Sequence, residues 1–320
     1  MATEPAAPAA AKRVSLVLGA GGARGLGHIG AIEVLQERGY RIVGIAGSSM
    51  GALVGGIHAA GRLPHYKEWA CALERGDVLR LLDFSFGFPG LIRGERVIGA
   101  LRDLVGEHAI ESLPIPFTAV ATDLQSQREV WLNRGPLFDA IRASIAIPMV
   151  FTPYRLEGRD LVDGGLLAPV PIAATRQVRA DLVIAIDVNG PPAARMARAE
   201  PVAAAAPAVA AEDAIGYRAR IAAFIESLSA SFSDAKRSEA SVEQAKAQPG
   251  LIDLMGRSLD TMQAQIARMQ LALDPPDLLI RMPRDRCTFY EFWRAAELIE
   301  LGRQCTQRAL DAFEAGQRER

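Results

Sequence analysis

The chain carries one serine in a setting that favours nucleophilic chemistry. Ser49 lies in the pattern Gly-x-Ser-x-Gly between Gly47 and Gly51, after a largely apolar run over 42–46. Such a run followed by this pattern predicts a strand, a sharp turn and a helix. A turn of this kind exposes the serine hydroxyl and places helical N–H groups behind it. We therefore take Ser49 as a candidate nucleophile, because the neighbouring Ser48 lacks the glycine spacing.

A serine nucleophile needs a proton acceptor, and the histidines of this chain are badly placed to supply it. The four histidines are His28, His58, His65 and His108, so none follows position 108. An α/β-hydrolase has its acid and then its histidine after the serine, further along the chain. The distribution of histidines therefore favours a carboxylate as the base.

Asp163 is the candidate for that carboxylate. It follows a short apolar run and precedes Gly164 and Gly165, which allow its backbone to approach another loop closely. Taken alone, a residue in this setting is more often a turn aspartate than a catalytic base. Asp123 and Asp187 are rivals, because each also ends an apolar run. Both could instead cap helices or bind loop amides.

A second glycine-rich turn extends from Gly19 to Gly25, directly after an apolar run over 14–18. Its small residues let backbone N–H groups face an anion, and a following helix adds partial positive charge. The anion could be a nucleotide phosphate or a catalytic oxyanion. A dinucleotide pattern occurs at 25–30, but it lies inside the expected helix, and no acidic residue ends the second strand. No Gly-Lys-Ser/Thr motif occurs either, so an oxyanion hole fits better.

Composition is ordinary for a globular protein. The 320 residues are 50% hydrophobic and 23% charged, enough for a substantial core. The net charge of −1 predicts no general attraction to nucleic acid, and we expect no nucleic-acid partner. Three scattered cysteines, Cys71, Cys287 and Cys305, fit a reduced, cytoplasmic setting without a disulfide framework or metal site. No apolar window is long enough to span a membrane, and we expect no metal or cofactor.

Strands alternating with glycine-terminated helices predict an α/β fold with a mostly parallel sheet. The expected strands cover 14–18, 41–46, 117–122, 181–187 and 277–282, and the expected helices cover 28–38, 51–60, 251–273 and 289–313. The aromatic segment 84–88 could line an acyl channel or touch a membrane, although core packing is the simpler role.

The chain resembles the patatin-like phospholipase family, in its compact bacterial branch. The matching segments are the loop Gly19–Gly25 with Arg24, the elbow Gly47–Gly51, the segments Ala143–Pro148 and Phe151–Pro153, and Asp163–Gly165. The resemblance implies a three-layer α/β/α fold with a C-terminal helical extension. It also implies a serine acyl hydrolase with a Ser–Asp dyad that acts on glycerophospholipids, lysophospholipids or simpler acyl esters.

The resemblance further implies a role for each motif residue. Ser49 is the nucleophile, Asp163 is its base, and the glycine loop binds the oxyanion through backbone N–H groups. The candidate oxyanion residues are Gly21, Gly22, Ala23, Arg24, Gly25 and Met50, and the motif glycines are Gly19, Gly47, Gly51, Gly164 and Gly165.

The expected organisation has four parts. They are a flexible leader over 1–12, the catalytic domain over 13–190, an Ala/Pro-rich loop or linker over 191–211, and a mainly helical region over 212–320 packed on the catalytic domain. The expected partner is a lipid or acyl-ester substrate. Peripheral contact with the inner membrane and homo-oligomerisation stay open, as do two alternatives: an acyl thioesterase, or a regulatory or membrane-associated protein that kept only the fold.

Overall fold

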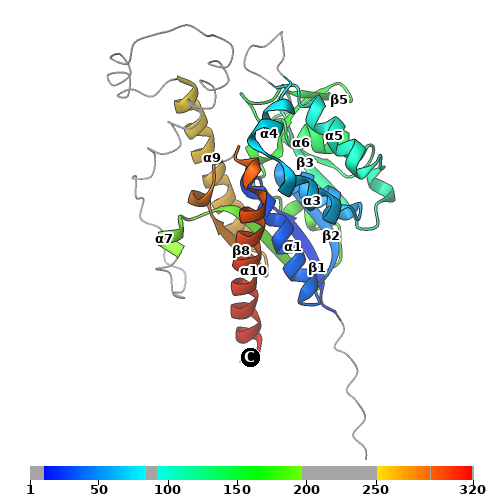
Figure 1. Ribbon diagram of the computed structural model, residues 1–320. Coiled ribbons are helices and arrows are strands. Elements are labelled where there is room, and N and C mark those ends of the chain that lie inside the picture. Colours follow the sequence, from blue (N-terminus) through cyan, green and yellow to red (C-terminus); the bar gives the residue numbers. More distant parts are fainter. Residues whose placement is uncertain (1–10, 84–91, 197–250, 289, 319–320) are drawn as a thin grey trace, which may run out of the picture.

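The computed structural model of the protein describes residues 11–83, 92–196, 251–288 and 290–318 (Figure 1). The expected leader and the Ala/Pro-rich loop lie largely outside these residues, and the aromatic segment 84–88 lies wholly outside them. Across the described ranges, no helix combines the length and the apolar character that crossing a bilayer requires.

The centre of the protein is an eight-stranded sheet of order β5-β6-β3-β2-β1-β7-β8, with β4 also paired to β3. The strands are β1 (Arg13–Leu18), β2 (Arg41–Ser48), β3 (Phe117–Asp123), β4 (Arg128–Leu132), β5 (Tyr154–Leu156), β6 (Arg159–Asp163), β7 (Leu182–Gly190) and β8 (Leu278–Pro283). β1, β2, β3, β7 and β8 pair in parallel, whereas β4 and the β5–β6 hairpin join in antiparallel fashion. β3 is buried along its whole length, as expected of a strand covered on both faces.

Helices connect several of the strands, with one α-helix after β1 and four in succession between β2 and β3. They are α1 (Gly27–Glu37), α2 (Met50–Ala59), α3 (Leu63–Ala72), α4 (Arg75–Arg80), α5 (Glu95–Val105), α6 (Leu137–Ser144), α7 (Ala193–Met196), α9 (Leu251–Leu273) and α10 (Ala295–Arg318). Three short 3-10 helices matter below: η1 (Gly22–Leu26), η3 (Gly164–Leu166) and η8 (Phe292–Arg294). The helix expected over 289–313 begins later, at Ala295, because η8 forms a separate turn before it.

Helices cover both faces of the sheet. Successive residues of a strand point to opposite faces, and in β1 both faces carry buried apolar residues. Leu16 and Leu18 of β1 belong to the large core cluster, which includes side chains of α1, α2, α6 and α10. Val17 faces the other way and packs in a smaller cluster against Ala267 and Leu271 of α9. This arrangement confirms the predicted α/β fold with a central, mostly parallel sheet between helical layers.

α10 lies beside α1, so the end of the chain covers the first helix (Figure 1). The two helices approach closely at glycines. A Cβ atom on Gly30 would lie 2.0 Å from the carbonyl oxygen of Ile299, and one on Gly302 would lie 2.0 Å from that of Gly27. Neither position can carry a side chain without separating the helices.

We expect Gly30→Ala to lower the free energy of unfolding by about 1–3 kcal/mol, the usual cost of overpacking. The matched control is Gly99→Ala in α5, where nothing lies within 4 Å of the added methyl group. That change should stabilise the protein by about 0.5–1 kcal/mol, because alanine loses less backbone entropy than glycine in a helix. Urea unfolding of both variants measures the difference. Equal effects would contradict the close α1–α10 contact.

Candidate active site

Ser49 stands at the junction of β2 and α2 in a strained backbone conformation. Its φ is 55° and its ψ is −125°, which non-glycine residues rarely adopt. The flanking glycines make the turn possible. A Cβ atom on Gly47 would lie 2.4 Å from the carbonyl carbon of Gly51, and one on Gly51 would lie 2.1 Å from the carbonyl oxygen of Leu18. Both glycines are therefore required by close backbone contacts.

The register of the sheet brings Asp163 to the same place. Ser48, the last residue of β2, is paired with Val120 of β3, and Asp163, the last residue of β6, is paired with Ala121. Val120 and Ala121 are consecutive residues. Because β2 runs parallel to β3 and β6 runs antiparallel to it, the two strands end facing each other. Ser49 and Asp163 thus meet although they are far apart in sequence.

The carboxyl group of Asp163 is only partly satisfied by hydrogen bonds. The residue is 3% exposed. Its Oδ1 accepts the N–H of Gly165 at 2.7 Å, while its Oδ2 is buried without a hydrogen-bond partner among the described residues. The Ser49 side chain interacts with this carboxyl group and favours its charged form.

Burial dominates the charge state of Asp163. It raises the pKa of this carboxyl group from 3.8 to about 7, while the interactions with Ser49 and with the Gly165 N–H lower it less. The group can therefore both take up and release a proton near neutral pH, which is the property a general base needs.

The segment at the end of α6 braces both residues. The N–H of Ser49 donates to Ser144 Oγ at 2.9 Å, and the Ser144 hydroxyl donates to the carbonyl oxygen of Val120 at 2.6 Å. The N–H of Asp163 donates to the carbonyl oxygen of Ala146 at 3.0 Å. Sequence reasoning included this segment in the family resemblance but gave Ser144 no role, because a buried serine hydroxyl leaves no signal in the pattern.

Two of the alternative residues have other partners. The hydroxyl of the buried Ser48 donates to the carbonyl oxygen of Ala168 at 2.6 Å. Asp123 accepts the N–H groups of Gln125 and Ser126, in the turn between β3 and β4. These bonds, with that of the Ser126 side chain, lower the pKa of Asp123 and keep it charged. Both groups hold loops in place.

The glycine loop rests against the serine elbow. The N–H groups of Gly19 and Ala20 bind carbonyl groups of neighbouring segments. The following residues, beginning at Gly21, open η1, whose first N–H groups have no partner inside the helix. A Cβ atom on Gly25 would lie 2.4 Å from the Met50 side chain, so η1 and the start of α2 are in direct contact. Gly22, at the start of η1, lines the same pocket as Ser49 and Met50.

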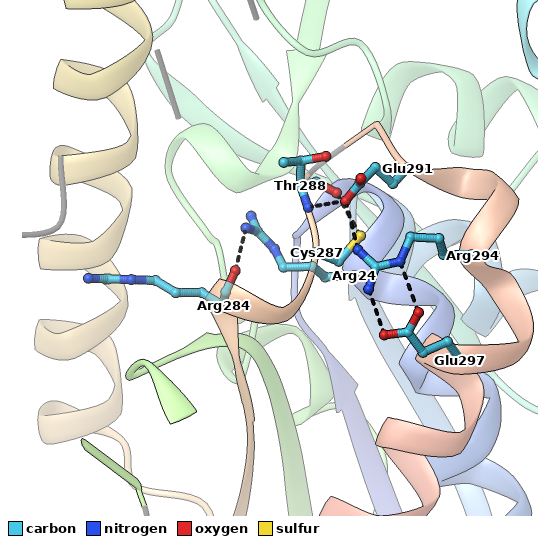
Figure 2. A network of polar contacts seen from close by, with 7 residues as sticks. All are labelled: Arg24, Arg284, Cys287, Thr288, Glu291, Arg294 and Glu297. Atoms are coloured by element: carbon cyan, nitrogen blue, oxygen red, sulfur yellow. Dashed lines mark hydrogen bonds and ion pairs between the residues drawn. The ribbon is translucent and has the colours of Figure 1, made fainter. Parts of the chain in front are cut away.

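Arg24 and Asp187 stabilise this loop from outside. Arg24 Nη1 donates to the carbonyl oxygen of Arg284 at 3.4 Å, which ties the loop to the segment after β8 (Figure 2). Asp187, the third candidate carboxylate, accepts the N–H of Asn189 at 2.9 Å, and the Asn189 amide donates to the carbonyl oxygen of Ala20 at 2.6 Å. Burial raises the pKa of Asp187. Its contacts support the loop and not the serine.

The buried histidines are packing residues. His28 Nε2 lies 2.8 Å from the carbonyl oxygen of Gly19, and burial lowers the pKa of His28 to about 4. Burial also lowers the pKa of His58 to about 4. Both rings are neutral at pH 7, and His28 fixes the start of the glycine loop. Within the described ranges, no three His, Cys, Asp or Glu side chains gather closely enough to hold a metal ion.

Ser49 opens into an apolar pocket with a volume of about 130 Å³. Its walls come from η1, α2, α3, α4, α5, the segment after α6, and η8. Apart from Ser49, Tyr66 and Trp69, the lining residues have purely apolar side chains or none. A pocket of this composition suits a hydrocarbon group placed next to the serine hydroxyl.

The chain is similar to several known proteins. The family model described as patatin-like phospholipase matches residues 16–176. A Mycobacterium tuberculosis protein described as an NTE family protein is 46% identical over 94% of this chain and 92% of its own. The lysophospholipase nte1 of Emericella nidulans is 31% identical over 56% of this chain, which is 12% of that protein. Among solved structures, VipD from Legionella pneumophila matches 95% of this chain and 67% of its own at 14% identity and a TM-score of 0.44.

We expect Ser144→Ala to lower the free energy of unfolding by about 1–3 kcal/mol, because the Ser49 N–H would stay buried without an acceptor. Ser112→Ala is the matched control: this exposed hydroxyl also donates to a backbone carbonyl, that of Ala109, at 2.8 Å. Its loss should change stability by less than about 0.5 kcal/mol. Urea unfolding measures the change in the free energy of unfolding for both variants. Equal small changes would show that the hydrogen bonds of Ser144 do not stabilise the fold.

Asp163→Asn should change the pH dependence of stability. Because burial raises the pKa of Asp163 to about 7, the folded protein keeps a proton that the unfolded chain releases at lower pH. The stability that this group contributes is therefore present below about pH 4 and falls by about 1.4 kcal/mol per pH unit as pH rises to about 7. Asparagine has no such dependence. Urea unfolding at acidic and at alkaline pH measures the difference. The free energy of unfolding of the variant should rise relative to that of the wild type as the pH increases.

The control for that experiment is Asp160→Asn, an exposed change on the same strand. This variant measures the effect of the same substitution where the side chain is exposed. A pH-independent difference between Asp163→Asn and the wild type would contradict the burial of an ionisable group at position 163.

Proposed function

The chain belongs to the patatin-like phospholipase family, and from this premise we propose that it hydrolyses a carboxylic ester of a lipid with Ser49 and Asp163 as a catalytic dyad. The contact between these two side chains, with Ser49 lining an apolar pocket, carries the proposal. The backbone strain at Ser49 supports it, because such strain concentrates at functional sites.

The first half of the reaction forms an acyl-enzyme. Asp163, as the carboxylate, takes the proton of the Ser49 hydroxyl while Oγ attacks the ester carbonyl carbon. The carbonyl π electrons move onto oxygen and give a tetrahedral oxyanion. When this intermediate collapses, the bond to the leaving oxygen breaks, and the departing alcohol takes the proton from Asp163. The acyl group then remains on Ser49.

The second half releases the acid. Asp163 takes a proton from a water molecule, which attacks the acyl carbonyl carbon. The new tetrahedral intermediate expels Ser49 Oγ, which recovers the proton from Asp163. The released carboxylic acid carries the acyl chain, and the enzyme returns to its starting state.

Backbone N–H groups stabilise both tetrahedral intermediates. The N–H groups at the start of η1, around Gly21 and Gly22, and that of Met50 at the start of α2 lie on the two elements that meet beside Ser49. The Ser49 N–H itself is unsuitable, since it already donates to Ser144. Fixed donors of this kind are each worth roughly 2.7–4 kcal/mol of the reaction barrier.

The experiment compares Ser49→Ala and Asp163→Asn with the wild type, using a p-nitrophenyl ester assay and labelling with a fluorophosphonate. Ser49→Ala should abolish labelling and lower kcat by about a thousandfold or more. Asp163→Asn should lower kcat by about a hundredfold or more, the usual contribution of a general base. Ser112→Ala should leave both readouts unchanged. Labelling that survives in Ser49→Ala would remove Ser49 from the mechanism.

The pH profile tests the base independently. Asp163 must be charged to accept the serine proton, and burial raises its pKa to about 7. We expect kcat/KM to fall about tenfold per pH unit below pH 7 and to level off above it. A profile that stays flat from pH 5 to 8 would exclude Asp163 as the base.

A further inference from the structure

One wall of the apolar pocket comes from outside the part of the chain that the family model matches. That match covers residues 16–176. Every described lining residue lies between Gly22 and Phe151 except Phe292, which belongs to η8 near the end of the chain. The family scaffold therefore supplies the serine and most of the pocket, while the C-terminal region supplies one aromatic wall.

Contacts with α3 and α4 hold η8 against the pocket. The Arg75 guanidinium of α4 lies 4.6 Å from the centre of the Trp293 ring, a cation–π contact. The rings of Tyr290 and Trp293 are 6.3 Å apart. Phe292 itself is partly buried and packs against the main core. These contacts join η8 to α3 and α4, which also line the pocket.

Local ion pairs connect η8 with the residues just before and after it in the chain (Figure 2). Arg294 Nη1 donates to Glu291 at 3.0 Å, and Arg294 Nε and Nη2 donate to Glu297 at 2.9 and 2.6 Å. Glu291 also accepts the N–H of Thr288 at 2.9 Å. A guanidinium group that binds one carboxylate through two N–H groups has a defined geometry. These pairs support the turn that carries Phe292, and packing against the core places this side chain in the pocket wall.

The volume of the pocket limits what it can hold. At about 130 Å³ it is slightly smaller than the engineered cavity of about 150 Å³ that binds benzene. It therefore holds about six carbon atoms. A longer acyl chain needs more space, and removing the phenyl ring of Phe292 would provide it.

We propose that Phe292 is a specificity-determining residue, which sets the acyl-chain length of the substrate at about six carbons. The proposal rests on the proposed function, because it assumes that the acyl group attacked by Ser49 enters this pocket. Each methylene that enters should raise kcat/KM about fourfold, the value of one buried CH₂ group. The rise should stop when the pocket is full.

The experiment measures kcat/KM for p-nitrophenyl butyrate, hexanoate, octanoate and decanoate. The wild type should reach its maximum near hexanoate. For Phe292→Ala, kcat/KM should continue to rise through octanoate, by about fourfold per added methylene. For Phe292→Leu, the maximum should shift toward longer chains by a smaller amount. Phe292→Trp should move the maximum toward butyrate. An identical maximum in all four proteins would overturn the proposal.

Tyr290→Ala is the matched control. It removes an aromatic ring from the same segment, but Tyr290 does not line the pocket. The chain-length profile should therefore match that of the wild type. A shift as large as that of Phe292→Ala would show that loosening the segment, and not the size of residue 292, determines selectivity.

A binding measurement separates this proposal from the proposed function. In a Ser49→Ala background, hexanoate, octanoate and decanoate are tested for displacement of an apolar fluorescent probe. Phe292→Ala should increase the affinity for decanoate relative to hexanoate by tenfold or more, since several methylenes become buried. This result would support the pocket assignment even if the wild type hydrolysed no ester. Unchanged relative affinities would overturn it even if the wild type were an active esterase.

Discussion

The site depends on one edge of β3, which two strands of opposite direction share. β2 occupies the first part of this edge and β6 the second, and their last residues pair with Val120 and Ala121. The junction leaves no space for a side chain after Asp163: a Cβ atom on Gly164 would lie 2.0 Å from the carbonyl oxygen of Val120. A one-residue change in either register would turn the end of that strand away from its partner. The geometry of Ser49 and Asp163 is thus a property of the sheet.

This geometry has an energetic cost that the surrounding bonds only partly offset. Asp163 loses most of its hydration on folding, and one N–H, that of Gly165, binds Oδ1. A fully hydrogen-bonded carboxylate would have a low pKa and would be a poor proton acceptor. Burial outweighs the interactions with Ser49 and with the Gly165 N–H and keeps the pKa of Asp163 near 7, at the expense of stability at neutral pH. The backbone N–H groups of Ser49 and Asp163 are both hydrogen-bonded, which supports the strained turn at Ser49.

The sequence predicts those parts of the fold that depend on local patterns. β1, β2, β3, β7 and β8 are apolar runs, and the expected bounds agree with the structure to within a few residues. β4 and β5 were not predicted, because they are short, partly exposed strands that contain charged residues such as Arg128 and Arg155. The motif glycines marked the turns correctly. The contact between Ser49 and Asp163 depends on strand register over a long sequence separation, which no local pattern encodes; only the family resemblance indicated it.

The C-terminal region shows how distant segments can act on the same site. β8 extends the sheet beside β7, and α10 packs on α1 where Gly30 and Gly302 allow close approach. α1 follows directly from the glycine loop, so the position of α10 is linked to that of the loop. The segment between β8 and α10 then contacts the loop through Arg24 and completes the pocket through Phe292. Because this segment lies outside the range that the family model matches, it can differ in size without changing the serine, the aspartate or the glycine turns. One aromatic wall of the pocket is therefore encoded apart from the residues of the chemistry, while the rest of the pocket lies in the same part of the chain as Ser49.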